Sequence, residues 1–131
     1  GWSSGAVLEN SSMSGAFFET WVVGEIYKSY LNAGKKPPMY FYRDSNRKEI
    51  DVILYRDGVV NPIEIKKSSA PKDACRNFSV LKPLERLSRE EDSAAEETRL
   101  KTTVGTGAVI CLAGYVLPID RSNWYIPAWL I

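Results

Sequence analysis

Histidine does not occur among the 131 residues of the sequence. Its absence excludes Ser-His-Asp and Cys-His nucleophile systems, histidine-based metalloprotease motifs and most zinc sites, because each of them needs an imidazole. The two cysteines, Cys75 and Cys111, are far apart and form no CxxC motif, so we expect reduced side chains in a reducing, cytoplasmic compartment. Any chemistry must come from carboxylates, lysines and hydroxyls.

Long apolar runs are missing as well. The longest, from Gly107 to Leu117, is far shorter than the ~20 residues that a membrane-spanning helix requires, so we expect no membrane partner. The phosphate-binding motif GxxxxGKS/T is also absent from the sequence, which excludes ATP binding by that motif within these residues.

Length and composition are those of one globular domain. Because the sequence begins at Gly1 and enters helical sequence within a few residues, we expect residues 1–131 to be a single domain cut from a longer polypeptide. Residues 88–99 hold five acidic and two basic side chains without apolar periodicity, which predicts an acidic mobile loop. The remainder is mildly basic, which suits either a weak phosphate-facing surface or ordinary solvation.

The spacing of apolar residues predicts the first half of the fold. Three- and four-residue intervals from the expected N-cap Ser14 to Leu31 predict a helix. Alternation with period two then predicts an antiparallel meander of three strands, with a tight turn at Asp57-Gly58 between the last two. These strands are expected over residues 39–43, 48–55 and 59–66.

The second half is predicted to add a helix and a buried strand. The helix is expected over residues 72–87, bent or divided by Pro83. A short apolar run at 108–113 suits a buried strand, and 123–131 suits a further strand or a hairpin with Leu117. The order helix-strand-strand-strand-helix-strand therefore predicts an α/β fold with a mixed sheet.

Two carboxylates face each other in the predicted meander. If Asp57-Gly58 forms a two-residue turn, counting outward along the ladder brings Asp51 opposite Glu64. Like charges in opposed positions destabilise a sheet unless something compensates them. A hard divalent cation, Mg²⁺ or Mn²⁺, would do so and could take the carbonyl of Ile65 as a further oxygen ligand.

Lys66 extends this cluster, because it lies two residues after Glu64 on the same face. A lysine beside a metal can contact an attacked phosphate, so the group suits hydrolysis of a phosphodiester. The same count also allows an ordinary ion pair between Glu49 and Lys66, with Asp51 and Glu64 turned into solvent or held by lysines. A bulge near Asp57 or Pro62 would shift the register by one residue.

Large aromatic residues occur within apolar patterns and are not interleaved with a basic stripe. We therefore expect them to be core or domain-docking residues and not platforms for stacking bases. They are Trp21, Tyr27, Trp124, Tyr125 and Trp129.

Asp51 followed by Glu64-Ile65-Lys66 resembles the PD-(D/E)XK signature of restriction-endonuclease-like nucleases, with Ile50 in place of the proline. Longer segments are similar to the domain of unknown function that follows the ATPase module in many predicted bacterial and archaeal AAA-type ATPases. These segments cover residues 15–29, 40–54, 62–68 and 126–130.

The resemblance implies a role for four residues. Asp51 and Glu64 match the metal-binding acids, Lys66 matches the catalytic lysine, and Glu19 matches an acid contributed by the first helix. It implies a restriction-endonuclease-like core that hydrolyses DNA or RNA with Mg²⁺ or Mn²⁺. It also implies an ATPase module in the same chain, which alone would bind ATP. The alternative is a non-catalytic accessory domain that docks on the ATPase module or a partner protein.

Overall fold

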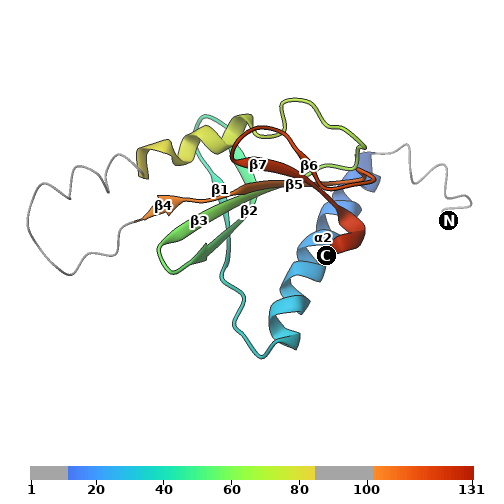
Figure 1. Cartoon of the computed structure of the whole chain (residues 1–131), viewed down its shortest axis with the longest axis horizontal. Coiled ribbons are helices and arrows are strands. Elements are labelled where there is room, and N and C mark those ends of the chain that lie inside the picture. Colours follow the sequence, from blue (N-terminus) through green and yellow to red (C-terminus); the bar gives the residue numbers. More distant parts are fainter. Residues whose placement is uncertain (1–11, 85–101) are drawn as a thin grey trace, which may run out of the picture.

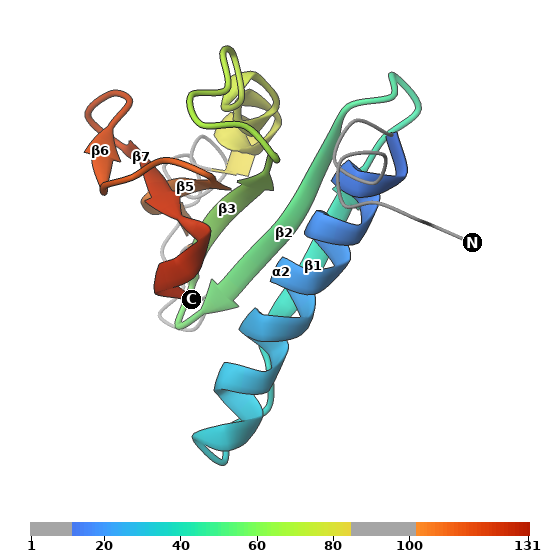
Figure 2. The same cartoon turned by 90° about the vertical axis from the view of Figure 1, so that its right-hand side faces the viewer.

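The computed structural model describes residues 12–84 and 102–131, so the predicted acidic loop at 88–99 lies outside the described residues. One mixed sheet forms the centre, with the strand order β1-β2-β3-β5-β7-β6 and β4 beside β3. The long helix α2 (Ser12–Asn32) covers one face of this sheet (Figures 1 and 2). The predicted α/β fold with a mixed sheet is confirmed. The strands are β1 (Met39–Arg43), β2 (Glu49–Arg56), β3 (Val59–Ile65), β4 (Thr103–Val104), β5 (Gly107–Cys111), β6 (Leu117–Pro118) and β7 (Asn123–Pro127).

The β2–β3 hairpin has the predicted turn and register. Asp57 and Gly58 both have positive φ, 52° and 78°, as a two-residue turn that follows the twist of the strands requires. Arg56 pairs with Val59, and the ladder continues without a shift to the pair Val52 and Ile63. The antiparallel meander is completed by β1, which pairs with β2.

A β-bulge in β2 corrects the predicted alternation of its side chains. Tyr40 pairs with Ile53 but Tyr42 pairs with Ile50, so that two residues of β2, at positions 51 and 52, lie opposite the single residue Phe41. Strict alternation with period two along residues 48–55 would place Ile50 on the same face as Val52. The structure instead places Ile50 with Ile53 on the opposite face, because the extra residue reverses the order of faces along the strand.

Apolar side chains cover the sheet on both faces. On the α2 face, Val22 and Ile26 pack against Val52, Ile63 and Ile110. On the opposite face, the cluster is made by Ile50, Ile53, Val60, Phe78 and Leu81. A third cluster holds Val109, Cys111 and Ala113. The sheet is therefore held from both sides, which fixes the positions of the strand ends.

The helices differ from their predicted bounds. Ser14 is buried inside α2 and does not cap it, since the helix already includes Ser12. The second helical segment begins at Arg76 and not at Lys72, first as the 3-10 helix η1 (Arg76–Leu81) and then as helix over residues 82–84. Asp73 explains the late start, because its φ of 52° is incompatible with a right-handed helix.

The C-terminal part confirms the predicted buried strand as β5, which runs parallel to β3 and β7. The predicted hairpin with Leu117 is also confirmed, since Leu117 pairs with Tyr125 between the antiparallel strands β6 and β7. The chain then forms the 3-10 helix η2 (Ala128–Leu130). Within the described ranges, no helix has the length and apolarity needed to cross a membrane.

Most of the large aromatic residues are not core residues. Trp21, Tyr27, Trp124 and Trp129 are between 37% and 69% exposed, and Tyr125 is partly buried and packs in the third cluster. For the four exposed residues, a role in docking on another domain therefore remains the prediction.

Two glycines provide a test of the packing. A Cβ at Gly107 would lie 2.1 Å from Oδ1 of Asn123 and 2.8 Å from the ring of Phe78, whereas a Cβ at Gly24 in α2 would meet nothing within 4 Å. We expect Gly107→Ala to lower the free energy of unfolding by about 1–3 kcal/mol and Gly24→Ala to raise it by about 0.5–1 kcal/mol. Urea denaturation of both variants measures these changes, and equal effects would contradict the described packing.

Candidate metal-binding site

The predicted site residues converge where the β2–β3 ladder ends. Beyond the pair Val52 and Ile63, the backbone N–H of Ile65 donates a hydrogen bond of 2.8 Å to Oδ2 of Asp51. The bulge directs this carboxylate into the gap between the two strands, where the next backbone partner would otherwise lie. Asp51 and Glu64 therefore come together at the end of the ladder, as the hairpin register predicts.

Glu64 is a buried residue, and one of its two carboxylate oxygens lacks a hydrogen-bond partner within the described residues. Its residue is 7% exposed, and its Oε1 lies 3.5 Å from Nζ of Lys66. Its Oε2 is buried and receives no hydrogen bond from any residue in the described ranges. Burial, followed by the charge of Asp51, raises the pKa of Glu64 to about 7.

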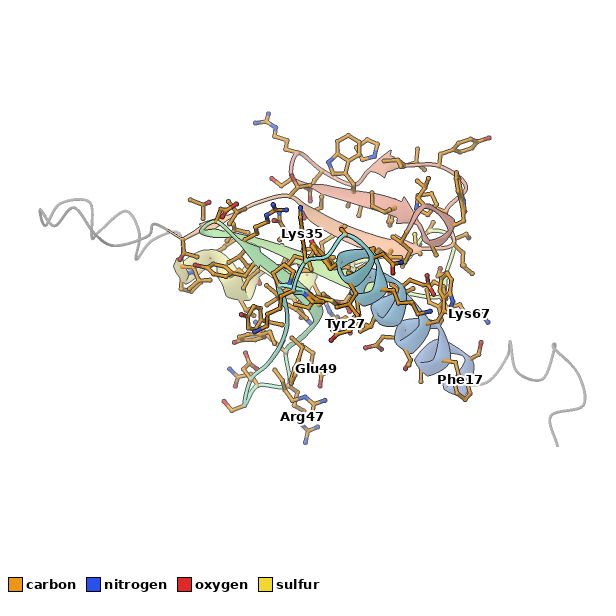
Figure 3. All side chains as sticks on the ribbon, turned by 90° about the horizontal axis from the view of Figure 1, so that it is seen from below. Phe17, Tyr27, Lys35, Arg47, Glu49 and Lys67 are labelled. Carbon is orange, nitrogen blue, oxygen red and sulfur yellow. The ribbon has the colours of Figure 1, made fainter. Side chains whose placement is uncertain are left out.

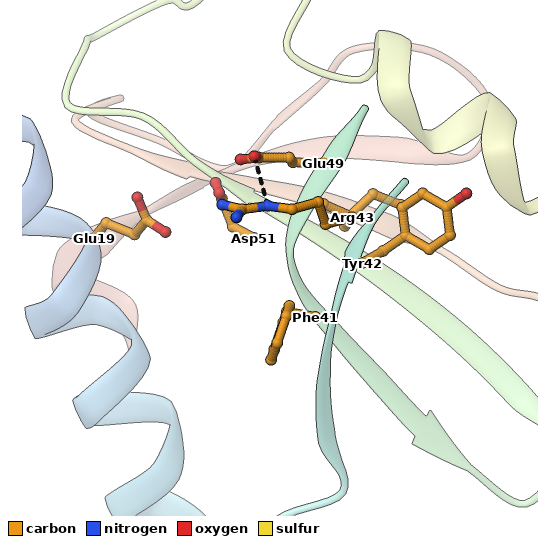
Figure 4. A pocket seen from close by; sticks show the side chains of 7 residues that line it. Glu19, Phe41, Tyr42, Arg43, Glu49 and Asp51 are labelled. Atoms are coloured by element: carbon orange, nitrogen blue, oxygen red, sulfur yellow. Dashed lines mark ion pairs between the residues drawn. The ribbon is translucent and has the colours of Figure 1, made fainter. Parts of the chain in front are cut away.

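Glu19 reaches the same place from α2. Burial raises its pKa, and the neighbouring charge of Asp51 adds to this effect, while Lys66 opposes it. Glu19 and Asp51 line a hollow of about 320 Å³ (Figure 4). The structure thus brings together all four residues that were predicted from the sequence.

Glu49 does not form the ion pair with Lys66 that the register allowed. Its Oε1 lies 2.9 Å from Nε of Arg43, which is its partner residue across the β1–β2 ladder. Lys66 pairs with Glu64 instead. The bulge explains the difference. The residues of β2 that precede Val52 in the chain are not paired with β3, whereas Glu49 and Ile50 remain paired with β1.

The oxygen donors fit a hard divalent cation. Asp51 and Glu64 provide two carboxylates, and Oε2 of Glu64 accepts no hydrogen bond within the described residues. The carbonyl of Ile65 points to the same side of β3 as its N–H, toward Asp51. Across residues 12–84 and 102–131, no group of three or more Asp, Glu or Cys side chains is arranged to hold a metal. The fit therefore depends on two carboxylates and backbone oxygen, a set that suits Mg²⁺ with several waters.

Two hollows flank the acidic residues, and further side chains line them. Phe41 and Arg43 of β1 line the hollow beside Glu19. Lys72 and Arg76 line a second hollow of about 220 Å³ beside Glu64 and Lys66. The sequence pattern predicts that Phe41 and Arg43 lie on one strand. That Asp51 lines the same hollow as these residues depends on the bulge, which the pattern does not reveal.

The cysteines take no part in this site. Both are free, and Cys111 is fully buried. Burial, with the charges of Asp120 and Glu64, raises the pKa of the Cys75 thiol to about 11. The thiol of Cys75 therefore stays protonated and unreactive at neutral pH.

A family model described as "Domain of unknown function (DUF4143)" matches residues 14–131 of the chain. No curated protein and no solved structure gives a significant match.

The raised pKa of Glu64 predicts how stability depends on pH. Its ordinary pKa is 4.5 and its folded value is about 7, so the folded state binds the proton more tightly. The resulting penalty is absent below pH 4.5, grows as the pH rises, and is complete above about pH 7. In metal-free buffer we therefore expect Glu64→Gln to raise the free energy of unfolding at pH 8 by roughly 1–3 kcal/mol.

Urea denaturation from pH 4 to pH 8 measures this difference between the wild type and Glu64→Gln. Glu49→Gln is the matched control, because Glu49 is on the neighbouring strand with a side chain that is 51% exposed. Parallel curves for the wild type and Glu64→Gln would show that the buried charge of Glu64 does not destabilise the fold.

Proposed function

The chain belongs to the DUF4143 family of domains of unknown function, and we propose that it is a divalent-cation-dependent nuclease-like domain that hydrolyses phosphodiester bonds of DNA or RNA. The proposal is carried by Glu64, a buried carboxylate whose Oε2 receives no hydrogen bond within the described part of the chain. An unsatisfied buried carboxylate is costly. Beside Asp51, a cation that binds both acids would remove the cost.

In this mechanism Asp51 and Glu64 would hold the cation, and the carbonyl of Ile65 would be a further ligand. When bound, Mg²⁺ or Mn²⁺ supplies Lewis acidity at the reacting phosphate. The ammonium group of Lys66 lies beside Glu64 and donates hydrogen bonds to the phosphate oxygens as their negative charge grows. Glu19, whose pKa is raised by burial, would accept a proton from the attacking water as the water oxygen bonds to phosphorus. The P–O bond to the leaving nucleoside oxygen would then break, and that oxygen would take a proton from solvent.

We extend the proposal to the core and to the parent protein. The spacing of Asp51 from Glu64-Ile65-Lys66 supports a PD-(D/E)XK core, as does an antiparallel meander followed by the parallel strand β5. The family resemblance of residues 15–29, 40–54, 62–68 and 126–130 supports an AAA-type ATPase module in the same polypeptide, which would bind ATP. The free cysteines accord with a cytoplasmic, reducing compartment.

Metal titration and a cleavage assay test this function together. We expect wild-type protein to take up Mg²⁺ or Mn²⁺ in calorimetry and to cleave a labelled nucleic acid. Asp51→Asn should lose both properties, because it removes a cation ligand. Lys66→Ala should still bind the cation but cleave about 100-fold more slowly or less, because one donor to the phosphate is missing.

Lys67→Ala is the matched control for the lysine, since the side chain of Lys67 bonds Ser14 of α2 and not Glu64. It should cleave at nearly the wild-type rate. Cation uptake without cleavage of single-stranded, duplex or branched substrates would reject the nuclease and favour an accessory domain.

The outer face of α2 supports a second candidate function, docking on the ATPase module. Phe17, Trp21, Tyr27 and Leu31 are each about half exposed there, and Figure 3 shows Phe17 and Tyr27 on this helix. The opposite side of α2 carries Val22 and Ile26 in the core. Exposed apolar side chains opposite the core face of a helix are typical of a surface that packs against a second partner.

Crosslinking of the full-length polypeptide tests this docking. Lys28 is exposed on α2, between Trp21 and Leu31 on the outer face, so a lysine-reactive crosslinker should join it to the ATPase module. Trp21→Ala with Leu31→Ala should remove those crosslinks because apolar contact area is lost. Lys72, which lines the hollow beside Glu64 and is not part of α2, is the control. Docking is ruled out if Lys28 crosslinks only within this domain.

A further inference from the structure

Phe41 is the most exposed of the large apolar side chains that the structure describes, at 80%. It lies on the edge strand β1, opposite the bulge that presents Asp51. Its ring faces the α2 side of the sheet and lines the hollow that also holds Glu19 and Arg43 (Figure 4). An aromatic face is therefore open to solvent directly beside the proposed cation site.

The surroundings of Phe41 distinguish it from an apolar docking face. The same hollow contains the charged residues Glu19, Arg43, Glu49 and Asp51. Arg43 is held by Glu49 through Nε, which leaves its remaining N–H groups available to a phosphate or to the edge of a base. A flat ring beside a guanidinium group matches an unpaired nucleotide, because the base stacks and the phosphate accepts hydrogen bonds.

The hollow on the other side of the acids carries positive charge. Lys66, Lys72 and Arg76 line it with Asn77, against the acidic residues Glu64 and Asp73. Such cations suit the phosphates of a nucleic-acid backbone. A strand that crosses the site would thus meet an aromatic ring on one side of the acids and cations on the other.

We propose that the substrate is single-stranded nucleic acid, with the unpaired base next to the scissile phosphate stacked on Phe41 and a neighbouring backbone phosphate bound by Lys72 and Arg76. This inference rests on the proposed nuclease function and names its substrate class. Duplex substrates are disfavoured, because a base must unpair and leave the helical stack to reach the ring.

Fluorescence anisotropy tests the inference with labelled oligonucleotides of one sequence as single-stranded DNA, single-stranded RNA and duplex DNA. Ca²⁺, which takes the same kind of oxygen ligands, replaces Mg²⁺. We expect single strands to bind more tightly than the duplex, and the DNA and RNA arms identify the preferred sugar. Phe41→Ala should weaken binding of the preferred single strand about 5- to 100-fold. Phe41→Trp keeps an aromatic ring and should bind that strand about as tightly as the wild type does.

Tyr40→Ala is the matched control, because Tyr40 is the preceding residue, is 61% exposed and lines an apolar hollow on the other face of the sheet. It should bind as the wild type does. Lys72→Ala and Arg76→Ala should each reduce the salt dependence of binding by about one phosphate contact.

The outcomes separate the substrate class from the nuclease function. Equal binding of duplex and single strand, or unchanged binding by Phe41→Ala, overturns the inference even if cleavage occurs. Binding of single strands that depends on Phe41, with no cleavage by the wild type in Mg²⁺ or Mn²⁺, supports the subsite and rejects the nuclease. Thermal melting confirms that Phe41→Ala remains folded.

Discussion

The hydrogen bond from the backbone N–H of Ile65 to the carboxylate of Asp51 organises the site. It occupies the position at which β2 and β3 would otherwise continue their ladder, and it depends on the bulge opposite Phe41. Because the carboxylate lies between the strands, acids from both sides of the sheet can approach it. Glu19 comes from the helix side, and Glu64 comes from the strand that follows the tight turn.

This arrangement brings the carboxyl groups of Glu19, Asp51 and Glu64 together at a partly buried end of the β2–β3 ladder. The pKa values of Glu19 and Glu64 are both raised, and burial is the main cause for each. The fold tolerates the repulsion because apolar clusters hold the same strands from both faces. A site that is destabilising without a ligand and stabilised by one is a common compromise between stability and function. Under the proposed function, a cation bound at the buried oxygen of Glu64 would offset the cost of burying it.

Helix α2 contributes to the core with one face and exposes apolar side chains on the other. Its inner side packs on the sheet and contributes Glu19 to the acidic cluster, while its outer side presents Phe17 and Trp21 to solvent. A partner bound to the outer side would therefore contact the helix that carries one of the four proposed site residues. The two candidate functions use different faces of one helix, so both can hold for the same protein.

Features that depend on near neighbours in the chain can be predicted from the amino-acid order alone. The turn at Asp57-Gly58 sets the register that brings Asp51 to Glu64, and local periodicity places α2 and the three strands of the meander. Other features become visible only once the chain is folded. The bulge, the pairing of Glu49 with Arg43 and the burial of Glu64 arise from contacts between segments that are separate in sequence. Alternation along one strand cannot reveal an extra residue, because the bulge exists only relative to the strand beside it.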